Sequence, residues 1–177
     1  MKEYYTALAD YSPKPIVIYN VPGRTGVNVA AETTLELAGH PNIIAVKEAS
    51  GFYAQISKII VNAPAEFSVL CGNDDETLSL MATGASGVIS VVSNIAPAHV
   101  AALTSSMLSG DWMKARELHH KIFPLFKGCF VESNPIPAKA ALSMMGIMEN
   151  ELRLPLTSAS ENTMVLLKGI LKNLELI

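Results

Sequence analysis

Short apolar runs alternate regularly with helix-like stretches in the first half of the chain, which leaves few folds open to it. Four runs rich in β-branched residues begin 20 to 27 residues apart. Helical patterns separate them, and the near absence of polar residues within the runs is typical of a parallel sheet that is covered on both faces. The expected strands are 16–19, 43–46, 67–70 and 87–92, and the helices between them are 29–37, 54–61 and 76–81. This α/β pattern fits both a doubly wound sheet and a (β/α) barrel.

The second half of the chain is predicted to be helical. Asp111 is placed as the N-cap of one of its helices, and a further helix is expected at the front of the chain. No low-complexity linker interrupts the sequence, so residues 1–177 are expected to form a single domain, with βα units in 1–95 and a helical extension in 96–177. The expected helices are 3–11, 97–108, 111–126, 135–145 and 158–174.

Charge and composition exclude several classes of protein. The chain has 13 Lys and Arg against 16 Asp and Glu, a net charge of -3, and no dense basic stretch, so a nucleic-acid partner is not expected. Between Glu76 and Asp111 no residue is charged, but Gly84, Gly87 and Pro97 break this stretch, which predicts a buried segment of a globular fold and no membrane association.

Three features of the sequence indicate where in the cell the protein is located and which cofactors it binds: its two cysteines, its histidines and its N-terminal residues. Cys71 and Cys129 lie in apolar runs and are expected to be buried, reduced thiols. The first residues show no signal-peptide pattern, and together these features predict a cytoplasmic protein. The four histidines have no metal-ligand spacing, and no glycine-rich phosphate-binding motif is present, so neither a metal nor a nucleotide cofactor is expected.

Polar residues follow the predicted strands, where parallel βα folds place their functional groups. Lys47 directly continues an apolar strand, and burial disfavours the charged form of a lysine, which is how a Schiff-base lysine is made nucleophilic. Tyr19 lies at the matching level one strand earlier, and a phenol beside an amine can carry the protons that this chemistry moves. The structural alternatives are a Lys47 side chain that reaches solvent or pairs with Glu48, and a Tyr19 that only packs.

Arg24 lies in a segment between Gly23 and Gly26, which is predicted to be a tight loop that presents the guanidinium to a carboxylate. A surface ion pair is the alternative role for this arginine. Acidic residues 74–76 stand at a predicted helix start, where they are expected to favour the helix dipole rather than to bind a metal.

Five sequence blocks in order resemble the dihydrodipicolinate synthase family, also called 4-hydroxy-tetrahydrodipicolinate synthase. Lys47 follows Tyr19 at the family's spacing, and the resemblance spans essentially the whole chain. The blocks are YNVPGRTG at 19–26, KEASG at 47–51, GVIS at 87–90, ESNPIPAK at 132–139 and LRLPL at 152–156.

The resemblance implies a class I aldolase-type (β/α)8 TIM barrel, usually a homotetramer, that condenses pyruvate with L-aspartate 4-semialdehyde in the diaminopimelate route to lysine. It implies that Lys47 forms the Schiff base with pyruvate, without any cofactor, and that Tyr19 shuttles protons. It also implies substrate-binding roles. Arg24 would hold the carboxylate of the semialdehyde, and the pyruvate pocket would be lined by Gly72, Asn73 and the backbone at Ile89.

The front of the chain departs from the family pattern. A (β/α)8 barrel has eight strands and about 250 residues, whereas four strands are predicted here, and they resemble the family's last four. The resemblance therefore implies the second half of the barrel, which lacks the family's Gly-Thr-Thr-Gly-Glu-like segment and its second tyrosine. Self-association or a complementary N-terminal half is expected to cover the open sheet edges.

Two other functions remain open on the sequence. One is another class I pyruvate-dependent lyase, similar to N-acetylneuraminate lyase; those sister enzymes lack an arginine at the position of Arg24, which favours the synthase. The other is a non-catalytic half barrel that only self-associates.

Overall fold

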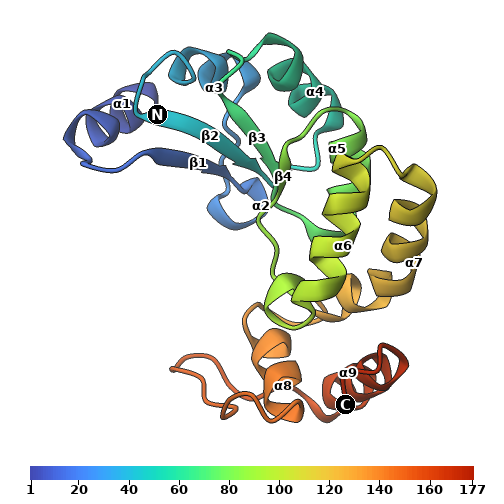
Figure 1. Cartoon of the computed structure of the whole chain (residues 1–177). Coiled ribbons are helices and arrows are strands. Elements are labelled where there is room, and N and C mark those ends of the chain that lie inside the picture. The colour runs from blue at the N-terminus through green and yellow to red at the C-terminus, as the bar shows by residue number, and fades with distance from the viewer. The chain divides into compact units, whose positions relative to one another are not determined.

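Four parallel strands form one sheet in the order in which they follow each other along the chain (Figure 1). The structure is a computed structural model that describes all 177 residues. Because the strands are parallel, their carboxyl ends lie at one edge, where the polar strand-end residues are brought together. The strands are β1 (Ile16–Asn20), β2 (Ile43–Glu48), β3 (Ser68–Cys71) and β4 (Gly87–Val88).

The last strand is much shorter than predicted. β4 has two residues, and the ladder to β3 ends with one further bond, from Ile89 N to Cys71 O at 2.9 Å. Beyond it, Ser90 Oγ accepts a hydrogen bond from Ser93 N at 2.8 Å at the start of the 3-10 turn Val92–Asn94 (η2). The predicted strand 87–92 was wrong because a serine side chain competes for backbone groups that a strand would need.

The chain divides into two compact units, Met1–Ile89 and Ser90–Ile177. The first unit holds the sheet and the helices that connect its strands, and the predicted helices are present with ends shifted by a few residues. The single-domain assignment stays a prediction. The helices of the first unit are α1 (Lys2–Tyr11), α2 (Pro22–Thr25), α3 (Ala31–Leu37), α4 (Tyr53–Asn62) and α5 (Thr77–Ala82), with the 3-10 turn η1 (Asp74–Glu76) before α5.

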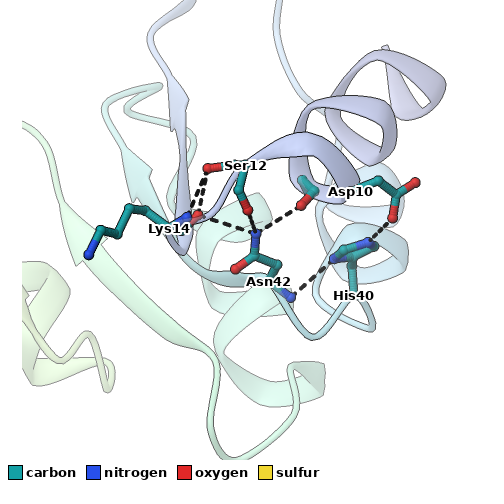
Figure 2. Close-up of polar contacts among 6 residues, drawn as sticks. Asp10, Ser12, Lys14, His40 and Asn42 are labelled. Atoms are coloured by element: carbon teal, nitrogen blue, oxygen red, sulfur yellow. Dashed lines mark hydrogen bonds and ion pairs between the residues drawn. The ribbon is translucent and has the colours of Figure 1, made fainter.

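A polar cluster ties the end of α1 to the start of β2 (Figure 2). Asn42 Nδ2 lies 2.8 Å from Ala9 O and 2.9 Å from Ser12 O, so one side chain satisfies carbonyls at the end of the helix. His40 Nε2 lies 3.0 Å from Asp10 Oδ1, and its Nδ1 accepts from Asn42 N at 3.1 Å. Both ring nitrogens are therefore engaged, which gives this Asp–His pair a structural role.

The second unit is helical, as predicted. α6 packs against α7, and α9 packs against both α7 and α8. Asp111 is the N-cap of α7 and accepts from Lys114 N at 3.0 Å, which confirms the predicted cap. The helices are α6 (Pro97–Leu108), α7 (Trp112–Gly128), α8 (Ile136–Met144) and α9 (Glu161–Asn173).

Burial of the cysteines follows the prediction. Cys71 and Cys129 are both buried, and neither forms a disulfide. Burial raises the pKa of the Cys71 thiol to about 12, although its Sγ donates to Asn73 O at 3.0 Å. No helix of the chain has the length and apolar character needed to cross a bilayer.

Candidate active site

Tyr19 and Lys47 face each other across the last part of the β1–β2 ladder. They are register partners, and Lys47 Nζ lies 4.2 Å from the centroid of the Tyr19 ring. An ammonium group at this distance from an aromatic face is held by a cation–π interaction. Each strand continues for one residue beyond its member of this pair, so the Tyr19 and Lys47 side chains stand on rigid strand backbone rather than on loops.

Lys47 is not paired with Glu48. Successive residues of a strand point to opposite faces, and the Glu48 carboxylate is fully buried, where it accepts a hydrogen bond from Ser50 Oγ at 2.7 Å. The half-buried Lys47 amine is in no ion pair, and its contact is with the Tyr19 ring. The amine therefore stays available for an incoming carbonyl group.

Arg24 lies in a short helical turn instead of the expected loop. α2 begins at Pro22, whose ring suits the first turn of a helix, and ends at Thr25, where Gly26 caps it with a φ of +71°. Only Gly26 needs the left-handed conformation, so the expectation that both glycines bend the chain was wrong for Gly23. Arg24 is exposed and makes no ion pair, which leaves its guanidinium free to bind a carboxylate.

Gly72 and Asn73 follow β3 at the same edge of the sheet. Gly72 N donates to Glu48 O at 2.6 Å, and a Cβ on this residue would lie 2.8 Å from Ala49 Cβ. The absence of a side chain thus lets the chain after β3 approach β2 closely. Asn73 Nδ2 donates to Glu76 Oε2 at 3.0 Å, so its amide is directed to its own turn.

Ile89 follows β4 at this edge. Its N–H is used by the bond to Cys71 O, which leaves the carbonyl oxygen as the backbone group that could contact a ligand. No group of three or more His, Cys, Asp or Glu side chains is arranged to hold a metal ion.

Two buried polar residues beside the site were missed by the sequence reasoning. Asn20 and Glu48 are fully buried and are register partners. The sequence contained the information needed to find them, because Asn20 directly follows Tyr19 and Glu48 directly follows Lys47 in a strand. The two-residue period of a strand places Asn20 and Glu48 on the face opposite to Tyr19 and Lys47. Burial raises the pKa of the Glu48 carboxyl, and the hydrogen bonds from Asn20 and Ser50 oppose this.

Comparison with known proteins identifies the same family as the motifs. Residues 1–174 match the model of the dihydrodipicolinate synthetase family. A 4-hydroxy-tetrahydrodipicolinate synthase of Thermotoga neapolitana is 49% identical over an aligned length of 174 residues, and the alignment covers 96% of this chain and 59% of the relative.

Solved structures agree with this relationship. The crystal structure of dihydrodipicolinate synthase from Thermotoga maritima has a TM-score of 0.96 at 47% identity, with 99% of this chain and 61% of the other covered. The chloride-inhibited enzyme of Acinetobacter baumannii, complexed with pyruvate, has a TM-score of 0.95 at 38% identity, with 99% and 60% covered.

The chain spans about three fifths of the length of these relatives. Over that length its α/β fold, with four parallel strands, matches their barrel structures. The family model, the relatives and the solved structures each match nearly all of the chain. The chain belongs to the dihydrodipicolinate synthetase family.

Proposed function

We propose that this chain is the C-terminal part of a 4-hydroxy-tetrahydrodipicolinate synthase, that it forms the second half of a (β/α)8 barrel, and that it carries the Schiff-base lysine. The observation that carries the proposal is the position of Lys47 Nζ, 4.2 Å from the centroid of the Tyr19 ring at the carboxyl edge of the sheet. The pyruvate complex of the A. baumannii relative supports pyruvate as the first substrate.

Lys47 is the nucleophile in this proposal. Its neutral amine attacks the C2 carbonyl carbon of pyruvate, and proton transfer from nitrogen to oxygen gives a carbinolamine. Tyr19 donates its phenolic proton to the carbinolamine hydroxyl, which leaves as water, and an iminium bond to Lys47 forms. The register pairing of the two residues supports these roles, because it places both groups at one point on the sheet.

The second substrate is an aldehyde that bears a carboxylate, L-aspartate 4-semialdehyde. The Tyr19 phenolate removes a proton from C3 of the bound pyruvate, and the resulting enamine attacks the aldehyde carbon. Tyr19 then returns the proton to the new alkoxide. Arg24, exposed and without an ion pair, holds the carboxylate of the aldehyde through its guanidinium.

Further strands complete the site in this proposal. β1 and β4 are the outermost strands of the sheet, and each has one side without a neighbouring strand. In β1 the Val17 and Tyr19 side chains are each 41% exposed. Unpaired edges and exposed inward-facing side chains favour association. The proposed partners are a complementary N-terminal half or further copies of the chain in a homo-oligomer.

The test is covalent trapping of pyruvate. The chain is incubated with pyruvate and borohydride, and intact-mass spectrometry with peptide mapping locates any reduced adduct. Lys47→Ala is the test variant, and Lys58→Ala is the matched control, because Lys58 is an exposed lysine paired with Glu32. An adduct on Lys47 is expected in the wild-type chain and in Lys58→Ala, and it is expected to be absent from Lys47→Ala. An adduct spread over several lysines contradicts the role of Lys47, and no adduct contradicts Schiff-base formation by copies of this chain without a complementary half.

A turnover assay without borohydride separates the synthase from its sister enzymes. Aspartate semialdehyde is expected to be consumed in the presence of pyruvate, and Arg24→Ala is expected to weaken its binding. Cleavage of a longer 2-keto sugar acid instead would assign the chain to another pyruvate-dependent lyase. Tight self-association without an adduct would make it a non-catalytic half barrel.

A further inference from the structure

The polar pair Asn20–Glu48 lies directly behind the reactive pair Tyr19–Lys47. Each member follows its counterpart in the chain, and the two pairs occupy successive rungs of the β1–β2 ladder. Because side chains alternate across a sheet, Asn20 and Glu48 project from the face opposite to Tyr19 and Lys47. On that face they continue a row that is otherwise apolar, since Ile18 and Val46, two residues earlier in each strand, are fully buried.

Side-chain hydrogen bonds connect the two strands at this rung. Asn20 Nδ2 lies 3.0 Å from Glu48 Oε1 and 3.2 Å from Oε2. The same nitrogen lies 2.9 Å from Asn28 Oδ1, so its two hydrogens are shared among several acceptors. The Asn20–Glu48 contact therefore joins β1 to β2 by side chains, in addition to the backbone ladder.

The same two residues also hold the loops that leave the strands. Asn20 Oδ1 accepts from Val29 N at 3.0 Å, which anchors the far end of the segment that contains Arg24. Glu48 accepts from Ser50 Oγ at 2.7 Å, which anchors the segment after β2. Three groups of the proposed site, the phenol, the amine and the guanidinium, are thus supported by one buried cluster.

Burying a carboxyl group costs free energy, so the fully buried Glu48 needs a physical explanation. An apolar side chain at position 48 would suit the row formed by Ile18 and Val46, and buried ionisable groups often do not add to stability compared with such a replacement. A shift of strand register by one residue would exchange the two faces and remove Lys47 from Tyr19. A side-chain bond that exists only in the observed register opposes that shift.

We propose that Asn20 and Glu48 are positioning residues for the reaction proposed above, and the inference rests on that function. They hold β1 and β2 in the register that sets the Lys47 amine against the Tyr19 ring, and they hold the segment that presents Arg24. Neither residue touches the substrate, since both lie on the opposite face of the sheet.

Nuclear magnetic resonance gives a readout that does not require catalysis. Because Lys47 Nζ lies over the Tyr19 ring, the ring is expected to shift the resonances of the Lys47 ε-methylene protons upfield, and Lys47→Arg assigns these resonances. The shift is expected to be retained in Glu48→Gln, which keeps an acceptor for Asn20 and has the shape of the acid. It is expected to be lost in Glu48→Ala, which removes the partner of Asn20.

A control variant separates positioning from a general loss of stability. Leu37→Ala removes a buried side chain from α3, away from the site, and is expected to destabilise the chain while keeping the shift. If Glu48→Ala does not fold, Glu48→Asp takes its place, because it withdraws the carboxylate by one methylene group and is expected to reduce the shift. Retention of the full shift in the folded Glu48→Ala or Glu48→Asp variant would overturn the inference.

The rate of borohydride trapping at saturating pyruvate is the second readout. It is expected to fall about 10- to 100-fold in Glu48→Ala, as for a displacement of a reactive group by about 1 Å, and to be kept in Glu48→Gln and Leu37→Ala. Equal rates in Glu48→Ala and the wild-type chain would contradict a positioning role. If the wild-type chain traps no pyruvate, the proposed function fails for this chain by itself, and the methylene shift still decides whether Glu48 positions Lys47.

Discussion

Lys47 Nζ lies 4.2 Å from the centroid of the Tyr19 ring, and the two residues are register partners in adjacent parallel strands. The tyrosine therefore presents two different features to the amine, an aromatic face that holds it and a hydroxyl that can exchange protons. These two contributions can be separated by substitution.

Tyr19→Phe is expected to keep the aromatic face and lose the hydroxyl. Pyruvate trapping should slow by about 100- to 10,000-fold, the usual contribution of a general acid–base group, while the upfield shift of the Lys47 methylene protons remains. Tyr19→Ala should lose both, including a cation–π contribution of about 0.5–1 kcal/mol. A Tyr19→Phe chain that traps pyruvate as fast as the wild type would remove Tyr19 from the proton transfers.

Gly72→Ala is expected to destabilise the first unit. The added Cβ would lie 2.8 Å from Ala49 Cβ and 2.9 Å from Glu48 O, and backbone cannot move away cheaply. The cost is expected to be about 1–3 kcal/mol in urea unfolding, as for other overpacked sites. Gly23→Ala is the matched control, because nothing lies within 4 Å of its added Cβ, and equal stabilities of the two variants would contradict the packing role of Gly72.

Cys71 is expected to resist alkylation in the folded chain. Burial raises the pKa of its thiol to about 12, so almost no thiolate exists at pH 8. Iodoacetamide followed by peptide mapping should find Cys71 unmodified without denaturant and modified in urea. Rapid labelling of Cys71 in the native chain would mean that the end of β3 opens to solvent.

Glu132 is expected to make the stability of the second unit depend on pH. Hydrogen bonds from Thr163 and Ser160 lower the pKa of this carboxyl, and the bond from Ser160 N is 2.9 Å long. A carboxyl with a lowered pKa in the folded state stabilises the fold above its unfolded pKa of about 4.3, and this contribution is lost as the pH falls through the folded value.

Urea unfolding of the wild-type chain and Glu132→Gln tests this expectation. The variant should be less stable than the wild type at pH 7, and the difference should shrink as the pH falls below about 4.3. Glu149→Gln provides a control at an exposed glutamate. A stability difference that stays constant with pH would mean that the Glu132 carboxylate does not hold the start of α9.

Local patterns in the sequence predicted most of the secondary structure. Apolar runs and helical periodicity placed three of the strands within two residues of their observed ends, and α6 was predicted with its observed bounds. Asp111 was recognised as a cap because capping involves residues three apart in the chain. These features depend on neighbours in sequence, and so they can be read without the fold.

Three expectations from the sequence differ from the structure. β4 ends after two residues because a serine turn follows it, and α2 replaces a loop because Pro22 and Gly26 favour one helical turn. The sequence reasoning treated Glu48 as a possible partner of Lys47, although strand alternation separates them. At β4 and α2 a local turn competed with the simpler pattern, and at Glu48 the strand alternation was not applied.

The motifs alone identified Tyr19, Lys47 and Arg24 as candidate site residues, and the roles of these residues remain predictions. What only the tertiary structure decided is how the strands are aligned. The register that opposes Tyr19 to Lys47, and buries Asn20 against Glu48 behind them, depends on residues 28 apart in the chain. Such contacts arise from packing between elements, whose geometry no local propensity encodes.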